Sequence, residues 1–151
     1  MLRAWRIVKE KYAAMAFSGE GAAEFGGRWN LPGTKMAYTS ESQSLATIEL
    51  LVHLNPPHFS KYKAIGIQFE EGLTESLSSY ELPPDWNVEP PSLLTQRLGS
   101  LWAAELRSVV LAVPSAIVPE ETNYLVNPLH PDFSRIEIGP ARDFALDSRL
   151  F

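Results

Sequence analysis

The chain has 151 residues, 45% of them hydrophobic and 21% charged, which is the composition of a soluble globular protein with one sizeable core. The absence of cysteine excludes disulfides, thiolate catalysis and thiolate metal sites in this sequence, and it fits a cytoplasmic protein. A net charge of -5 argues against a broad nucleic-acid-binding surface, and no apolar run is long enough to span a bilayer. Since His53, His58 and His130 lack the pair spacing of zinc ligands, no metal site is expected. We expect one α+β domain over residues 1–151.

The first half of the chain carries alternating strand and turn signals. The elements expected here are a strand at Leu2–Val8, a loop or broken helical turn at Tyr12–Phe25, a turn at Trp29–Lys35, a short strand at Met36–Thr39 and a strand at Tyr62–Phe69. A helix is expected between the last two strands, beginning at Ser40 or Ser42. Ser40 with Gln43 fits a capping box, and prolines stop the helix at Asn55-Pro56-Pro57.

The second half begins with a polar, proline-rich segment, Glu70–Pro91, which we interpret as a long surface connection with Trp86 packed back on the body. The elements expected after it are a helix at Ser92–Arg107 with Leu94, Leu98, Leu101 and Trp102 in the core, a strand at Val109–Val113 buried on both faces, a hydrogen-bonded corner at Asn123–Pro131, a strand at Arg135–Ile138 and a docked tail at Phe144–Phe151.

A glycine-rich turn presents the first candidate site residue. Gly26, Gly27 and Gly33 remove side chains around Arg28, so a ligand could approach the backbone there. The guanidinium of Arg28 is a rigid fork of donors that suits a phosphate or a carboxylate. The turn lacks the lysine and the following Ser/Thr of a P-loop, and it is not a GxGxxG dinucleotide fingerprint.

Glu49 is the second candidate, because helical spacing from Leu45 through Ile48 to Val52 places it on the apolar stripe of its helix. A carboxylate removed from water is costly unless it is paired or hydrogen-bonded. Such a residue is either functional, or a boundary glutamate that reaches water, or one half of a structural ion pair with Arg28.

Two other arrangements are poor candidates. Ser115 with His130 and an aspartate could be imagined as a triad, but no GxSxG elbow surrounds Ser115, and a serine after Pro114 is typical of a turn. His130, between Leu129 and Pro131, is interpreted as a structural hydrogen-bonding residue rather than a base.

The remaining set is Arg28, Tyr38 and Glu49, joined by Ser115 and Asn127. This combination suits cleavage of an N-glycosidic bond beside a diphosphate. The arginine would hold phosphate, the tyrosine ring would stack on a flat base, and the glutamate would stabilise positive charge developing on the sugar.

The chain resembles the RES-domain family, which is named for an arginine, a glutamate and a serine. Seven blocks in order carry the resemblance over nearly the whole chain: WRI at Trp5–Ile7, GGRWNLPG at Gly26–Gly33, AYTSESQSLATIELLVHL at Ala37–Leu54, LPPDW at Leu82–Trp86, TQRLGSLW at Thr95–Trp102, VPSAIVPEETNYLVNPLHPDF at Val113–Phe133 and FALDSRL at Phe144–Leu150. The resemblance implies a fold of the ADP-ribosyltransferase type, with a curved, split β-core and helices at its edges.

The resemblance also implies a chemistry. NAD+ would be a substrate rather than a cofactor, broken down with release of nicotinamide, and the acceptor would be phosphate, water or a protein side chain. The family's arginine, glutamate and serine match Arg28, Glu49 and Ser115. Arg6 and Tyr38 match further positions of the NAD+ cleft, and Asn127 matches the asparagine of an Asn-Pro corner.

Toxin members of this family are paired with Xre-type antitoxins, so the resemblance implies an antitoxin partner that occludes the active site, with a homodimer possible within the complex. Three hypotheses of different classes follow. The protein is a NAD+-consuming toxin, an ADP-ribosyltransferase that modifies one protein, or a catalytically silent nucleotide-binding module. The intact arginine, tyrosine and glutamate argue against the catalytically silent module. Any binding to operator DNA is expected of the antitoxin partner and not of this chain.

Overall fold

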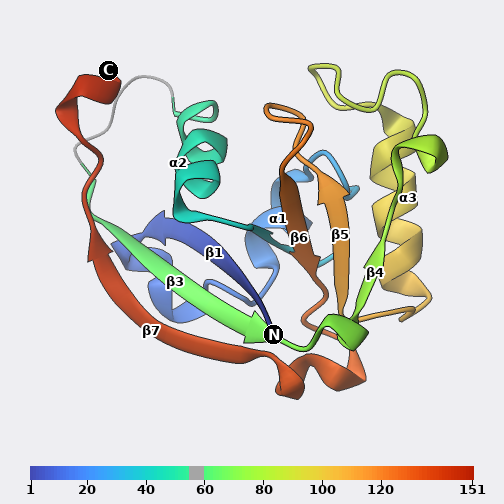
Figure 1. The fold of residues 1–151 in the computed structure, drawn as a ribbon, viewed down its shortest axis with the longest axis horizontal. Helices are drawn as coiled ribbons and strands as arrows, with labels where there is room; N and C mark the ends of the chain where they lie inside the picture. Colours follow the sequence, from blue (N-terminus) through green and yellow to red (C-terminus); the bar gives the residue numbers. More distant parts are fainter. Residues whose placement is uncertain (55–59) are drawn as a thin grey trace.

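The computed structural model describes residues 1–54 and 60–151 (Figure 1). Its strands are β1 (Leu2–Lys9), β2 (Ala37–Ser40), β3 (Tyr62–Phe69), β4 (Thr74–Ser76), β5 (Val110–Pro114), β6 (Thr122–Val126) and β7 (Glu137–Phe144). Its α-helices are α1 (Glu20–Phe25), α2 (Gln43–Leu51) and α3 (Leu93–Ala104). Short 3-10 turns are η1 (Glu10–Met15), η2 (Glu71–Leu73), η3 (Ser79–Glu81), η4 (Pro131–Arg135) and η5 (Ser148–Leu150). The expected helix stop at Asn55-Pro56-Pro57, and His58, lie outside the described residues.

The strands form a single sheet in the order β4-β5-β6-β2-β1-β3-β7. β1 pairs with β3 over eight positions, from Leu2 opposite Phe69 to Lys9 opposite Tyr62. β1 and β2, by contrast, share one paired position, Trp5 opposite Ser40. The sheet is therefore split into two halves, and β1, β3 and the curved β7 run at a steep angle to β4, β5 and β6 (Figure 1). The expected α+β class with a curved, split β-core is confirmed.

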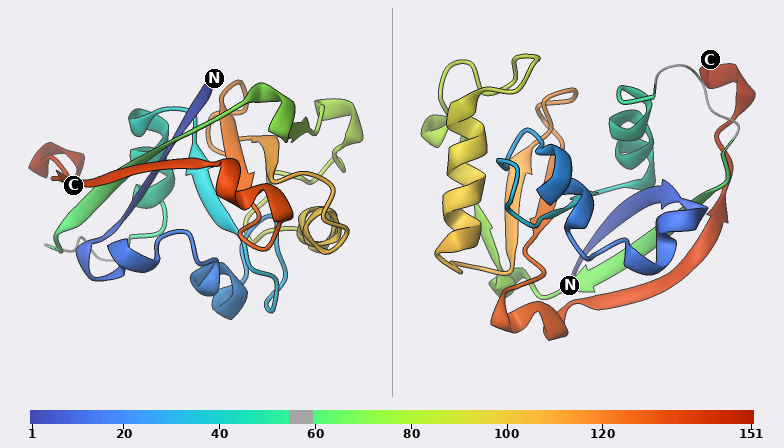
Figure 2. Two further views of the ribbon diagram at one scale, coloured as in Figure 1. Left: turned by 90° about the horizontal axis from the view of Figure 1, so that it is seen from below. Right: turned by 180° about the vertical axis from the view of Figure 1, so that it is seen from behind.

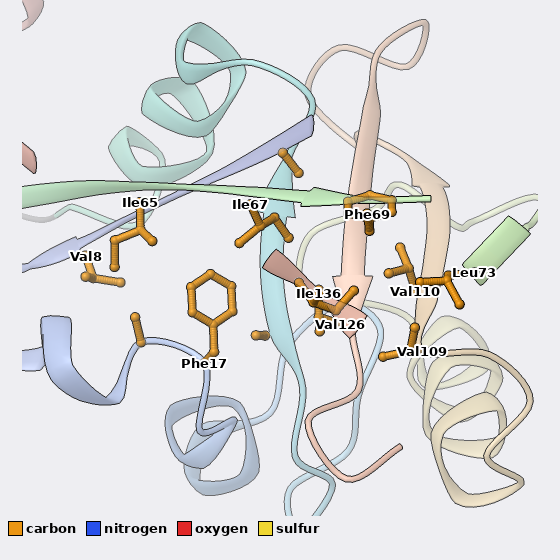
Figure 3. Packing of buried hydrophobic residues seen from close by; sticks show 13 residues of the cluster. Val8, Phe17, Ile65, Ile67, Phe69, Leu73, Val109, Val110, Val126 and Ile136 are labelled. Atoms are coloured by element: carbon orange, nitrogen blue, oxygen red, sulfur yellow. The ribbon is translucent and has the colours of Figure 1, made fainter. Parts of the chain in front are cut away.

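The main hydrophobic cluster joins the two halves of the sheet. Val8 and Ile65 come from the β1–β3 half, and Val110 and Val126 come from the β5–β6 half (Figure 3). Segment 10–25, with η1 and α1, lies on one face of the sheet, and Phe17 enters the cluster from it (Figures 2 and 3). Strand β5 is buried from Val110 to Val113, as its continuous apolar run predicts.

Helix α3 packs through a different face from the one that its leucines predict. Leu94 and Leu101 are 51% and 55% exposed. The buried positions are Thr95, Gly99, Trp102 and Ala103. The physical reason is close approach: a Cβ at Gly99 would lie 1.8 Å from the carbonyl oxygen of Trp29, so only glycine lets α3 pack on this backbone.

The segment expected to be a plain surface connection, Glu70–Pro91, contains strand β4, which pairs in parallel with β5. Three residues are too short for period-two alternation to be recognised in sequence. Trp86 does pack back on the body, as predicted, against the cluster that holds Trp29 and Trp102.

Three C-terminal expectations are corrected by the structure. Residues Asn123–Val126 belong to strand β6, so the corner is confined to the residues after it. The expected strand Arg135–Ile138 is instead η4 followed by the longer β7. The tail docks through Phe144 and Leu146, while Leu150 and Phe151 are exposed. In the described part of the chain, no helix is long and apolar enough to cross a membrane.

We predict that Gly99→Ala lowers the free energy of unfolding by about 3 kcal/mol, because a backbone carbonyl cannot move aside as a flexible side chain can. Gly21→Ala is the matched control, since a Cβ there meets nothing within 4 Å. That substitution is expected to add up to about 1 kcal/mol of stability from helix propensity. Urea denaturation of both variants measures the difference, and an unchanged or raised midpoint for Gly99→Ala contradicts the prediction.

Candidate active site

A cavity of about 800 Å3 lies where the β1–β2 ladder stops, within the roughly 300–1,000 Å3 typical of small-molecule sites. Its walls come from β1, β2, α2, the glycine-rich turn, the start of β6 and segment 87–91. Four of the six expected site residues line it: Arg6, Arg28, Tyr38 and Glu49. Ser115 and Asn127 do not line it.

Arg6 projects from β1 at the split in the sheet. Its Nη1 donates to the carbonyl oxygen of Tyr38 at 2.9 Å, so the guanidinium bridges β1 and β2 where their ladder has ended. Its Nε is buried and has no hydrogen-bond partner. Burial lowers the pKa of Arg6 to about 10, which leaves it charged at neutral pH. Arg6 is half-buried and lines the cavity, so its positive charge is suited to bind an anion there.

Tyr38 is held by the turn that precedes it. Its hydroxyl donates to Asn30 Oδ1 at 2.6 Å and accepts from the backbone N–H of Trp29 at 3.1 Å. Burial raises the pKa of Tyr38 above its usual range, against weaker opposing effects of the Trp29 N–H and Arg28. The phenol therefore stays protonated and acts here as a fixed donor while its ring faces the cavity.

The glycines of the turn serve its conformation and packing. Gly26 and Gly33 have φ of 74° and 99°, which other residues rarely adopt. A Cβ at Gly27 would lie 2.6 Å from the Tyr38 hydroxyl, so this glycine admits the tyrosine. The buried Asn30 is the centre of the turn, because its Nδ2 donates to the carbonyls of Ala22, Leu31 and Thr34. Sequence analysis missed Asn30.

Arg28 contacts the segment that precedes α3. Its Nη1 donates to the carbonyl oxygens of Trp86 at 3.1 Å and Val88 at 2.7 Å, and its Nη2 pairs with Glu89 Oε2 at 3.1 Å. The ion-pair hypothesis for Arg28 and Glu49 is therefore wrong, since the carboxylate beside Arg28 is that of Glu89. Segment 87–91 forms a wall of the cavity, a role that its polar, proline-rich composition did not indicate.

Glu49 lies on α2, which begins after Ser42; this serine caps the helix by accepting from the Leu45 N–H at 3.0 Å. Ser40 does not form the expected capping box with Gln43, because it belongs to β2. The apolar stripe also differs from expectation, since Ile48 and Val52 are exposed while Leu45 and Ala46 are buried. Glu49 itself is half-buried at the edge of this face and lines the cavity.

One oxygen of Glu49 receives two hydrogen bonds. Ser115 Oγ and Asn123 Nδ2 each donate to Oε1 at 2.7 Å. Ser115 is fully buried, and its oxygen also accepts the backbone N–H groups of Ile117 and Val118 at 3.1 Å. Because its single proton is given to a carboxylate, the hydroxyl holds Glu49 and is not poised as a nucleophile.

Asn127 and Asn123 stand at opposite ends of β6, about 13 Å apart at 3.3 Å per residue. The amide of Asn127 is used in the corner: Nδ2 donates to the carbonyl of Ala103, and Oδ1 accepts from the Leu129 N–H. Asn123 is the asparagine that lines the cavity and contacts Glu49, and sequence analysis missed it. The sequence could have indicated Asn123 only through the strand pattern of β6, because that strand pairs with β2.

His130 is structural, as predicted. Its Nδ1 accepts from the Asp132 N–H at 2.9 Å, and its Nε2 lies 3.1 Å from the carbonyl oxygen of Leu106. Both ring nitrogens are occupied, which sets the neutral ring with its proton on Nε2. Across residues 1–54 and 60–151, no group of three or more potential metal-ligating side chains is found.

The sequence and the fold are both similar to known proteins. The sequence model of the RES domain family matches residues 3–147. "Toxin Res" of Photorhabdus laumondii is 39% identical over 97% of this chain and 95% of that protein. "Prs ADP-ribosylating toxin" of Sphingobium sp. is 39% identical over 97% and 94%. The fold matches a chain of the M. tuberculosis MbcT-MbcA toxin-antitoxin complex with a TM-score of 0.72 at 17% identity, covering 95% of this chain and 84% of that one. The chain belongs to the RES domain family.

Proposed function

We propose that this protein is the toxin of a bacterial toxin–antitoxin pair, and that it cleaves the bond between nicotinamide and ribose in NAD+, depleting the nucleotide and arresting growth. The names of its relatives support the toxin assignment, since they include "Toxin Res" and an "ADP-ribosylating toxin". The substrate is supported by the chemistry of the cavity. NAD+ is consumed, and the proposal requires no metal or separate cofactor.

The observation that carries the proposal is the pairing of charges in one cavity. The carboxylate of Glu49 is fixed through Oε1, and Oε2 has no hydrogen bond among the described residues. Arg6 reaches the same cavity as a half-buried cation. A dinucleotide meets both needs, because its diphosphate is an anion and its nicotinamide riboside centre gains positive charge on the sugar as the bond breaks.

The reaction then follows from these positions. Arg6 and Arg28 hold the diphosphate, and the ring of Tyr38 stacks on the flat nicotinamide. The C1′–N bond breaks, its electron pair goes to the ring nitrogen, and neutral nicotinamide leaves. Glu49 stabilises the oxocarbenium-like sugar electrostatically. An acceptor oxygen bonds to C1′ and its proton passes to solvent, giving ADP-ribose phosphate if the acceptor is phosphate and ADP-ribose if it is water.

A second candidate is transfer of ADP-ribose to a side chain of one host protein. The relative named "Prs ADP-ribosylating toxin" is the observation in its favour. The two functions share the bond that breaks and differ in the acceptor. Incubation of the pure protein with NAD+, with and without phosphate, separates them by product: free nicotinamide with ADP-ribose or its phosphate for the first, and little turnover until a target protein is added for the second.

We predict that Glu49→Gln loses nicotinamide release by a factor on the order of 100 or more, because a preorganised negative charge is removed. The fold should persist, since the amide oxygen of glutamine can accept the same two hydrogen bonds from Ser115 and Asn123. Product release and a melting curve measure the two effects. Turnover within a few-fold of the parent would remove Glu49 from the proposed role.

Arg28 and Glu89 supply a paired prediction. Because Glu89 occupies an Nη2 contact that a phosphate would use, Glu89→Gln should lower the KM for NAD+ several-fold with kcat little changed. The stability effect should be at most about 1 kcal/mol, since this glutamate side chain is 73% exposed. Arg28→Lys should weaken NAD+ binding, because a point charge cannot replace the fork.

A purely structural role for Arg28 predicts a different result for these two variants. If Arg28 serves only to anchor segment 86–89, Glu89→Gln leaves the affinity for NAD+ unchanged and Arg28→Lys lowers the melting temperature without weakening binding. Calorimetric titration with NAD+ and thermal denaturation distinguish these outcomes.

We further propose that an antitoxin of the Xre type inhibits the protein by entering the cavity. A chain of a toxin–antitoxin complex is among the structural neighbours, which supports a protein partner. The cavity offers Arg6 and Arg28 to an inhibitor, so an acidic or carboxylate-terminated segment gains most there.

Competition tests this mode of inhibition. A cognate antitoxin, titrated into Glu49→Gln protein, should raise the apparent Kd for NAD+ in proportion to its concentration. Simultaneous and independent binding of antitoxin and NAD+ would rule out occlusion.

A further inference from the structure

Asn123, which was not among the expected site residues, links two other side chains through hydrogen bonds. It is the second residue of β6, directly opposite Ser40 of β2 in the sheet register. Ser40 Oγ donates to Asn123 Oδ1 at 2.7 Å, and Asn123 Nδ2 donates to Glu49 Oε1 at 2.7 Å. Three elements, β2, β6 and α2, are thus joined through one side-chain amide at the wall of the cavity.

These two hydrogen bonds fix which end of the Asn123 amide faces Glu49. A carboxylate can only accept, so the nitrogen of Asn123 must point to it and the oxygen must point to Ser40. The hydroxyl of Ser40 supplies a proton for that oxygen. The reverse orientation would set a carbonyl oxygen against a carboxylate oxygen at hydrogen-bond distance, which is repulsive.

We propose that Asn123, oriented by Ser40, is a positioning residue for Glu49. Together with Ser115 it holds Oε1 from β6 and from the turn after β5, and this fixes the plane of the carboxylate so that Oε2 is turned to the substrate. The inference rests on the proposed NAD+ cleavage, because Glu49 is the group that it positions. Its consequence is that Asn123 affects kcat through the charge and direction of Glu49, and leaves KM nearly unchanged.

Asn123→Asp is the sharpest test, because the side chain keeps its shape and exchanges one donor for an acceptor. We expect kcat at pH 7 to fall by about 100-fold, because two carboxylate oxygens now face each other where a donor stood. The acid limb of the kcat profile should move up by about one pH unit or more, since facing carboxylates hold a proton more tightly than one alone. The pH profile moves only if kcat depends on the charge of Glu49, and Ser40→Ala, which adds no charge, tests the orienting role.

Ser40→Ala is the second variant, and it leaves both Asn123 and Glu49 in place. Loss of the orienting hydroxyl should lower kcat about tenfold, the effect of one hydrogen bond, with KM retained. Thr95→Val is the matched control, since it removes another buried hydroxyl hydrogen bond, to the Ser92 carbonyl, outside the cavity. It should lower the melting temperature and leave kcat unchanged.

The outcomes separate this inference from the function on which it rests. If the parent protein releases no nicotinamide from NAD+, the proposed function fails, and the role of Asn123 fails with it. If the parent and Thr95→Val release nicotinamide and Glu49→Gln does not, the results for Asn123→Asp and Ser40→Ala decide the inference. Parent-like kcat and pH profile in Asn123→Asp, or parent-like kcat in Ser40→Ala, would overturn it.

Discussion

The single paired position between β1 and β2 is the constraint on which the site depends. A continuous ladder there would occupy the backbone groups of both strands and close the sheet. With Trp5 and Ser40 as the only shared position, β2 turns toward β6, and its Tyr38 carbonyl is left for the guanidinium of Arg6. The cavity, the cation in it and the two-part sheet are consequences of the same break in pairing.

A split sheet needs another source of cohesion, and the apolar core provides it. One cluster extends from Val8 and Ile67 on one side of the split to Val110 and Val126 on the other. Burial of such side chains stabilises each by about 1.5–3 kcal/mol. The polar cost at the cavity, including the unpartnered Nε of Arg6, is offset by this packing.

Sequence patterns predicted the elements best where burial alone decides them. The run Val109–Val113 indicated β5, and eight alternating residues indicated β3. They failed where a close contact overrides hydrophobicity: α3 faces the body with Gly99, because the carbonyl of Trp29 lies there, and its leucines are left outside. Pairings between distant segments, such as β4 with β5, have no local signal, and β4 was missed for that reason.

The candidate site residues divide in the same way, into those that local sequence can indicate and those that it cannot. Arg28, Tyr38 and Glu49 could be selected from sequence because their chemistry is unusual for their local pattern, although the reasoning for Glu49 used neighbours that are in fact exposed. Ser115 was also selected, but its contact with Glu49 could not be predicted, because the two residues lie 66 positions apart. Asn123 lies 74 positions from Glu49 and was missed. Asn127 was selected for its Asn-Pro corner, and only the register of β6 against β2 shows that Asn123 is the asparagine beside the site.

The two polar partners of this carboxylate, Ser115 and Asn123, are held in different ways. Ser115 is fixed by the turn after β5, because two backbone N–H groups already hold its oxygen, so its proton has one direction left. Asn123 is fixed by Ser40, whose hydroxyl decides which end of the amide turns toward α2. A charge on a helix of nine residues is thereby held from the sheet and not by its own helix. Movement of α2 relative to β5 and β6 would disturb both bonds to Oε1 at once, so the geometry of Glu49 is coupled to the packing of the whole β2–β6–β5 half.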